Sequence, residues 1–257
     1  MIRQGKPFAL SLSKGAAPRY GSALVALLCL FAPGARAVET SQPAHPPVGA
    51  NDTGYTYTVG PFTTEYEPPP AGSYTLPVIE RVADHALLDS GGGATGLAGL
   101  KSGRLAVVAF VYTTCAEAAG CPLAGAIMQR LDRKLADDPA LAGQVRLLTI
   151  SFDPERDTPE RMATVRRAFA PKTDWAFLTT RDEAQLAPIL ADFGQPVAKL
   201  YYEDGTWTGL YRHVLKVFLL DEQNRVRNIY STGLMSPELV MNDLRTLAGE
   251  RPAPAER

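Results

Sequence analysis

Two cysteines, Cys115 and Cys121, stand six residues apart at the end of an apolar, β-branched run. On one straight helix this separation turns through about 600°, so the two thiols would face away from each other. Both can reach one ligand only if Cys115 lies in a loop, and Gly120 and Pro122 favour a turn followed by a helix start. Cys121 would then be the N-cap, where the positive helix end favours a thiolate. Since thiolates attack disulfides and also bind Cu(I) or Zn(II), the loop predicts a reactive dithiol or a soft-metal site.

The same pair also fits simpler roles, namely a structural disulfide or two inert buried thiols. A C-x5-C spacing is weak evidence by itself. Its position at a strand-to-helix turn, in a chain whose mature form carries no other cysteine, favours a functional pair.

Two further residue types bear on this site. Of the three histidines, His45 and His85 lie in polar or proline-rich stretches and are expected to be solvated. His213 opens an apolar run, and by its residue type and place it is as readily a hydrogen-bonded structural histidine as a ligand. An acidic cluster follows the second buried run, and its loop is expected on the same sheet edge as the cysteines. There Asp153 is a candidate to orient the site, whereas Asp157 is expected to cap a helix.

The composition restricts the class of protein. The 257 residues are 46% hydrophobic and 21% charged, as in an ordinary globular domain with some irregular extension. Five of the 26 basic residues and none of the 27 acidic ones lie in residues 1–37, so the remainder is mildly acidic. No nucleic-acid partner is expected from this charge.

The N-terminus predicts export. Basic residues precede the apolar run 23–32, which is too short to span a membrane, and Ala35-Arg36-Ala37 has the form of a cleavage site. We expect a signal peptide at 1–37 and a periplasmic or cell-envelope location, with an uncleaved membrane tether as the less favoured alternative. A proline-rich tether at 38–71 and a tail at 251–257 are expected to be disordered. One folded domain is expected at 72–250.

Strands and helices alternate from residue 105 onward in the order β-α-β-α-β-α-β-β-α. Apolar runs predict strands at 107–112, 145–152, 175–178, 214–220 and 226–230, with shorter pieces at 76–79, 86–88 and 199–202. Apolar residues at helical spacing and helix-start residues predict helices at 122–136, from 157 through 169, at 182–193 and from 236 to about 247. The pattern predicts an α/β thioredoxin-like fold, with a central mixed sheet flanked by helices and a C-terminal β-hairpin and helix.

The chain resembles the Sco/SenC family, exported thioredoxin-like proteins of cytochrome c oxidase assembly, from about residue 72 to 247. The resemblance is carried by Phe110–Cys115, Cys121-Pro122-Leu123, Thr149–Glu160, Phe193-Gly194, His213 and Leu219-Leu220-Asp221. It implies one copper ion per chain, bound by Cys115, Cys121 and His213. Two thiolates and an imidazole suit Cu(I) and can also hold Cu(II).

One departure from the family bears on function. The family usually has C-x3-C-P, whereas this chain has C-x5-C-P, which enlarges the chelate loop. Two hypotheses follow. The first is a monomeric copper metallochaperone that supplies a cuproprotein client, such as an oxidase subunit. The second is a periplasmic thiol–disulfide oxidoreductase that acts on a client's cysteines and needs a thiol reductant partner. A thiol peroxidase is a more distant third.

Overall fold

The computed structural model describes residues 66–115, 117, 120–231 and 235–249. The expected signal peptide at 1–37 and the tail at 251–257 lie outside this part of the chain. The expected tether at 38–71 also lies outside it, apart from residues 66–71.

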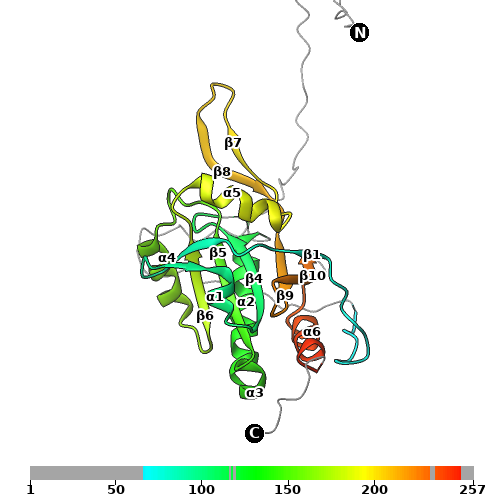
Figure 1. Cartoon of the computed structure of the whole chain (residues 1–257). Helices are drawn as coiled ribbons and strands as arrows, with labels where there is room; N and C mark the ends of the chain where they lie inside the picture. Colours follow the sequence, from blue (N-terminus) through cyan, green and yellow to red (C-terminus); the bar gives the residue numbers. More distant parts are fainter. Residues whose placement is uncertain (1–65, 116, 118–119, 232–234, 250–257) are drawn as a thin grey trace, which may run out of the picture. The chain divides into compact units, whose positions relative to one another are not determined.

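An eight-stranded mixed sheet forms the centre of the fold, in the order β1-β10-β9-β4-β5-β6-β2-β3 (Figure 1). Strands β4, β5 and β6 run parallel, and β9 is antiparallel both to β4 and to β10. The bounds are β1 Glu80–Arg81, β2 Ala86–Asp89, β3 Ala94–Gly96, β4 Leu105–Val111, β5 Val145–Ser151, β6 Trp175–Thr179, β9 Lys216–Leu220 and β10 Arg225–Ser231.

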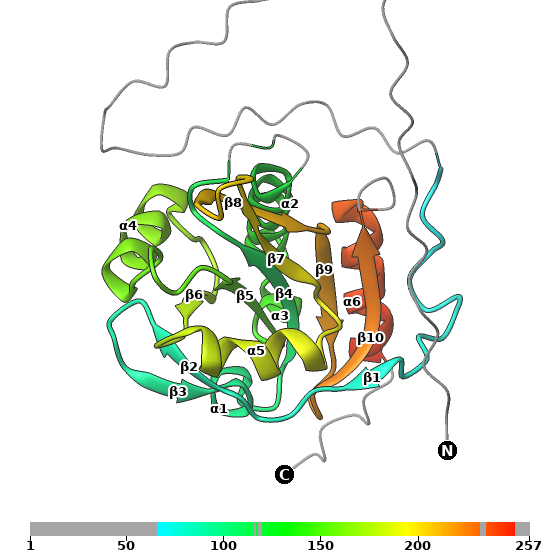
Figure 2. The same ribbon diagram turned by 90° about the horizontal axis from the view of Figure 1, so that it is seen from above.

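Helices cover both faces of this sheet, and Figure 2 shows α2 and α5 on opposite sides of it. Leu105, Val107 and Ala109 of β4 pack in one core with α2, α4 and α6, while the alternate residues of β4 pack in a second core with α1 and α5. The helices are α1 Leu97–Lys101, α2 Cys121–Ala136, α3 Pro139–Ala142, α4 Pro159–Phe169, α5 Glu183–Asp192 and α6 Pro237–Gly249. Both faces of β4 are buried, which explains why its residues are uniformly apolar. The predicted α/β thioredoxin-like fold is confirmed.

A separate two-stranded hairpin was only half predicted. Strands β7 Val197–Tyr201 and β8 Trp207–His213 pair with each other and stand away from the main sheet (Figure 1). No strand was predicted at 207–213, since Gly209 lies in that run with a φ of +79° next to a break in the pairing register. His213 therefore ends β8, and the prediction that it opens the following strand is wrong.

Smaller differences occur before residue 105. The strand predicted at 76–79 is absent, and the short β1 begins just after it, at Glu80. The strand predicted at 86–88 is confirmed as β2. Helix α1 and strand β3 were not predicted, because elements of five and three residues are too short to show a period.

Candidate metal centre

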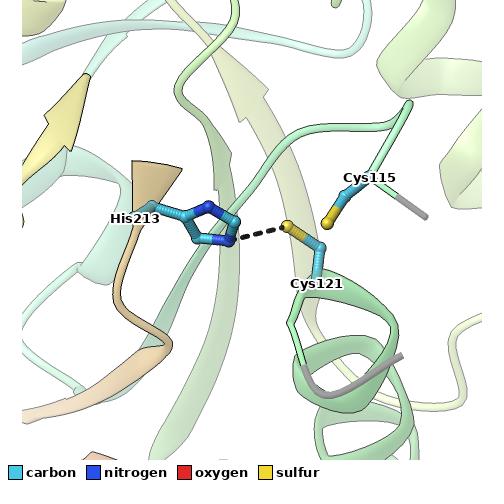
Figure 3. Close-up of side chains that lie close together, drawn as sticks. All are labelled: Cys115, Cys121 and His213. Atoms are coloured by element: carbon cyan, nitrogen blue, oxygen red, sulfur yellow. Dashed lines mark hydrogen bonds between the residues drawn. The ribbon is translucent and has the colours of Figure 1, made fainter. Parts of the chain in front are cut away.

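Three soft or borderline donors meet at one point above the sheet (Figure 3). The Sγ atoms of Cys115 and Cys121 and a ring nitrogen of His213 all lie within 4.8 Å of one another. The Sγ of Cys121 is 3.6 Å from Nε2 of His213. Both thiols are buried, and neither is in a disulfide in the described structure. The fold thus brings together the three residues that the family resemblance implied, although 92 residues separate Cys121 from His213.

Helix α2 places Cys121. The helix begins at Cys121 itself, with Gly120 as its N-cap and Pro122 in its first turn, one residue earlier than expected. The backbone N–H of Tyr112 donates to the Cys121 sulfur at 3.4 Å. A Cβ on Gly120 would lie 3.2 Å from the Glu117 carbonyl and 3.4 Å from the Cys115 sulfur. Glycine therefore suits this position because the turn passes close to the first thiol.

A buried carboxylate holds the loop that carries Cys115. Asp157, which is fully buried, accepts hydrogen bonds from the backbone N–H and the hydroxyl of Thr113 and from the hydroxyl of Ser151. Arg161 also donates to the Thr113 hydroxyl at 3.1 Å. The prediction that Asp157 caps helix α4 is wrong, because Thr158 is the N-cap. Burial raises the pKa of Asp157, and this effect exceeds the lowering by the hydrogen bonds from Thr113 and Ser151.

Two aromatic rings orient His213. Its imidazole packs against Phe152 at a centroid distance of 5.1 Å and against Tyr112 at 5.7 Å. Its Nδ1 lies 3.4 Å from the backbone carbonyl of Tyr211, which can only accept, so Nδ1–H is the donor. This tautomer leaves the Nε2 lone pair directed at the sulfurs, as a metal ligand requires.

The pKa values of the two thiols shift in opposite directions. A hydrogen bond from Cys121, together with backbone N–H groups of Cys121 and Glu117, lowers the pKa of Cys115 to about 5 despite burial. The hydrogen bond with Cys115 and then burial raise the pKa of Cys121. These opposite directions favour the thiolate on Cys115, whereas the sequence pattern favoured it on Cys121. The cause is that the first residue of the helix donates to its neighbour's sulfur.

Asp153 lies near this site without contacting its donor atoms. Its carboxylate accepts from the Tyr211 hydroxyl at 3.1 Å and forms an ion pair with Arg156. Arg156 is half-buried, with its guanidinium carbon 4.4 Å from the Trp207 ring centroid. Sequence reasoning missed the aromatic residues of this site, Tyr112, Phe152, Trp207 and Tyr211.

Among the described residues, no helix is both long and apolar enough to cross a membrane.

Comparisons with known proteins agree with this fold. The SCO1/SenC family model matches residues 80–249. The structure of Bradyrhizobium japonicum ScoI with copper bound is 25% identical, with a TM-score of 0.52, and the match covers 65% of this chain and 99% of that one. A SCO1/SenC family lipoprotein from Bacillus anthracis is 26% identical, with a TM-score of 0.54 and coverage of 66% and 95%.

A third solved relative, apo Sco1 from Thermus thermophilus, is 25% identical, with a TM-score of 0.52 and coverage of 67% and 95%. Comparison with the curated proteins found no match. Because the family model matches well over half of the residues, the chain belongs to the SCO1/SenC family.

Proposed function

We propose that this protein is a copper metallochaperone that holds one copper ion between Cys115, Cys121 and His213. The observation that carries the proposal is the convergence of two sulfurs and one imidazole nitrogen within 4.8 Å. Two thiolates and an imidazole are donors that suit Cu(I). In this role copper is the cargo of the protein rather than a resident cofactor. The copper-bound ScoI relative supports this choice of metal.

The protonation of the metal-free pair is consistent with copper loading. Cys115 has a lowered pKa and Cys121 a raised one, so Cys115 is the first sulfur available to a soft metal. Binding through both sulfurs therefore displaces the Cys121 proton, so copper loading releases acid. The two residues added to the usual cysteine spacing do not prevent the sulfurs from approaching each other.

The client of this chaperone is proposed to be a cuproprotein, such as a subunit of a respiratory cytochrome c oxidase, and the protein is proposed to act as a monomer. We place it in the periplasm or cell envelope after cleavage behind Ala37. The basic and apolar N-terminal residues support export, and the Bacillus anthracis relative is described as a lipoprotein. The N-terminal sequence of the protein purified from the cell envelope tests this placement.

The close pair of sulfurs favours thiol–disulfide exchange as a second candidate function. In that reaction the Cys115 thiolate attacks a client disulfide and releases one client sulfur as a thiolate, which takes a proton from solvent. Cys121 then attacks the mixed disulfide, releasing the second client thiol, which takes up the Cys121 proton. Two electrons pass to the client and leave a Cys115–Cys121 disulfide, which a thiol reductant must reduce again.

Anaerobic titration of the reduced protein with Cu(I), in competition with a chromophoric chelator, tests the proposed function. We expect one equivalent to bind and the affinity to fall by about tenfold or more in His213→Ala. His85→Ala is the matched control, because His85 bonds Asp192 in another part of the domain. Failure of the wild-type protein to bind one equivalent, or equal affinity in His213→Ala, would reject copper carriage and leave exchange as the function.

A further inference from the structure

One arginine lies at the centre of the contacts that hold the β7–β8 hairpin to the body. The guanidinium carbon of Arg156 is 4.4 Å from the Trp207 ring centroid, 5.8 Å from that of Tyr211 and 5.9 Å from that of Tyr112. The same guanidinium pairs with Asp153, whose side chain is fully buried. A cation among aromatic rings and beside a buried carboxylate is a strong anchor.

Strand β8 is shaped to receive this arginine. Gly209 has a φ of +79°, and a Cβ there would lie 3.4 Å from an Arg156 Nη atom. Glycine thus permits both the backbone turn and the close approach of the guanidinium. Two residues further on, the Tyr211 hydroxyl donates to the carboxylate that Arg156 pairs with. Trp207, Gly209 and Tyr211 therefore all lie against the Arg156–Asp153 pair.

The end of the same strand carries the candidate ligand. His213 follows Tyr211 by two residues, and both rings pack on Tyr112 and Phe152. Strands β7 and β8 pair with each other rather than with the eight-stranded sheet. His213 is tied through its backbone to β7 and, three residues later, to β9, so side-chain contacts beneath the hairpin add to these ties in setting where its ring lies.

We propose that Arg156 is a positioning residue for His213. By holding Trp207, Gly209 and Tyr211, it fixes the end of β8 and so sets the approach of Nε2 to the Cys121 sulfur. Loosening this anchor lets the histidine move away from the thiols, which speeds the release of copper to an acceptor. The effect on copper rests on the proposed function, whereas the effect on histidine position is a property of the metal-free protein.

Two variants test this role, and each keeps part of the anchor. Trp207→Leu removes the ring but keeps an apolar side chain, and Arg156→Lys keeps the charge beside Asp153 but loses the planar guanidinium. Tyr202→Ser is the matched control, because this residue is exposed at the end of the hairpin. The readouts are the His213 ring-proton NMR shifts of the metal-free protein and the rate of Cu(I) transfer to a chelator.

In Trp207→Leu, we expect the His213 ring protons to lose part of their ring-current shift and copper release to become roughly 3- to 30-fold faster. Arg156→Lys is expected to give a smaller change in the same direction, and Tyr202→Ser to stay within about twofold of wild type. Amide NMR shifts of the main sheet report whether a variant keeps its fold. If Trp207→Leu is unfolded, the result for Arg156→Lys alone tests the proposal.

Unchanged His213 shifts in both variants, or an equal effect in Tyr202→Ser, would overturn the role of Arg156 in positioning His213. Changed shifts with an unchanged release rate would overturn its effect on copper release. If the wild-type protein fails to bind Cu(I), the proposed function fails instead. The NMR shifts of the metal-free protein then still decide whether Arg156 positions His213.

Discussion

Single buried hydroxyl and carboxylate groups determine the path of the chain beside the thiols. Thr113 is buried two residues before Cys115 and bonds to Asp157, while its neighbour Thr114 is exposed. Nothing in the sequence distinguishes these two threonines, because a period-2 pattern has no meaning where a strand ends in a loop. The role of Thr113 follows only from the contact with Asp157, 44 residues away.

This difference predicts unequal effects of two identical substitutions. Thr113→Val removes the hydroxyl that Asp157 and Arg161 contact, and it leaves a buried carboxylate short of a donor. We expect the free energy of unfolding to fall by roughly 1–3 kcal/mol. Thr114→Val is the matched control and should change it by less than about 0.5 kcal/mol. Urea unfolding of the reduced, metal-free proteins measures both values, and equal values would show that the Thr113 hydroxyl does not hold the loop.

Among the elements, the long ones could be predicted and the short or irregular ones could not. Helix α2 has Ile127, Leu131 and Leu135 on one buried face, as their four-residue spacing indicated. Strand β8 shows no comparable pattern, since Tyr211 packs in the second apolar core while Trp207 and Gly209 lie against Arg156. Strand β8 was therefore missed because a cation–aromatic contact carries no hydrophobic period.

The turn between β9 and β10 depends on a charged group. Asp221, buried at this turn, accepts hydrogen bonds from the backbone and side chain of Arg225 and from Arg227. Burial alone would raise its pKa, but these hydrogen bonds hold the pKa below the ordinary value of 3.8. The folded protein therefore binds this proton more weakly than the unfolded chain. The carboxylate stabilises the fold above about pH 4, and this stabilisation is lost as the pH falls through the folded-state pKa.

Asp221→Asn should therefore destabilise the protein in a pH-dependent way. We expect a loss of roughly 1–3 kcal/mol at pH 7, and a smaller difference from wild type as the pH falls towards 3. Urea unfolding at a series of pH values measures the difference. Glu203→Gln, an exposed carboxylate between β7 and β8, is the control and should have little effect at neutral pH. A difference that stays constant from pH 7 to 3 would show that the charge of Asp221 does not stabilise the turn.

At the scale of the whole molecule, the candidate site joins the turn between β4 and α2 to the end of β8. Asp157 holds the turn, and aromatic rings hold the end of β8. The sequence alone indicated a dithiol at the turn between β4 and α2, because an apolar strand, a glycine and a proline surround it. It left His213 undecided, since a single histidine at a strand end has no characteristic spacing from Cys121, 92 residues away. The family resemblance indicated that ligand set, and the topology supplies the physical reason: His213 at the end of β8 lies beside Cys121 at the start of α2 (Figure 3).

Copper should therefore stabilise the entire domain, because it can bind all three donors only in the folded chain. With free Cu(I) buffered at 100 times its Kd, mass action adds about 2.7 kcal/mol to the free energy of unfolding. For a domain of this size we expect Tm to rise by roughly 5–10 °C. Thermal unfolding of the reduced protein, followed by circular dichroism with and without buffered Cu(I), measures this shift. Because oxidation to the Cys115–Cys121 disulfide removes two ligands, the oxidised protein should show no rise, and an equal rise in both forms would mean that copper binds elsewhere.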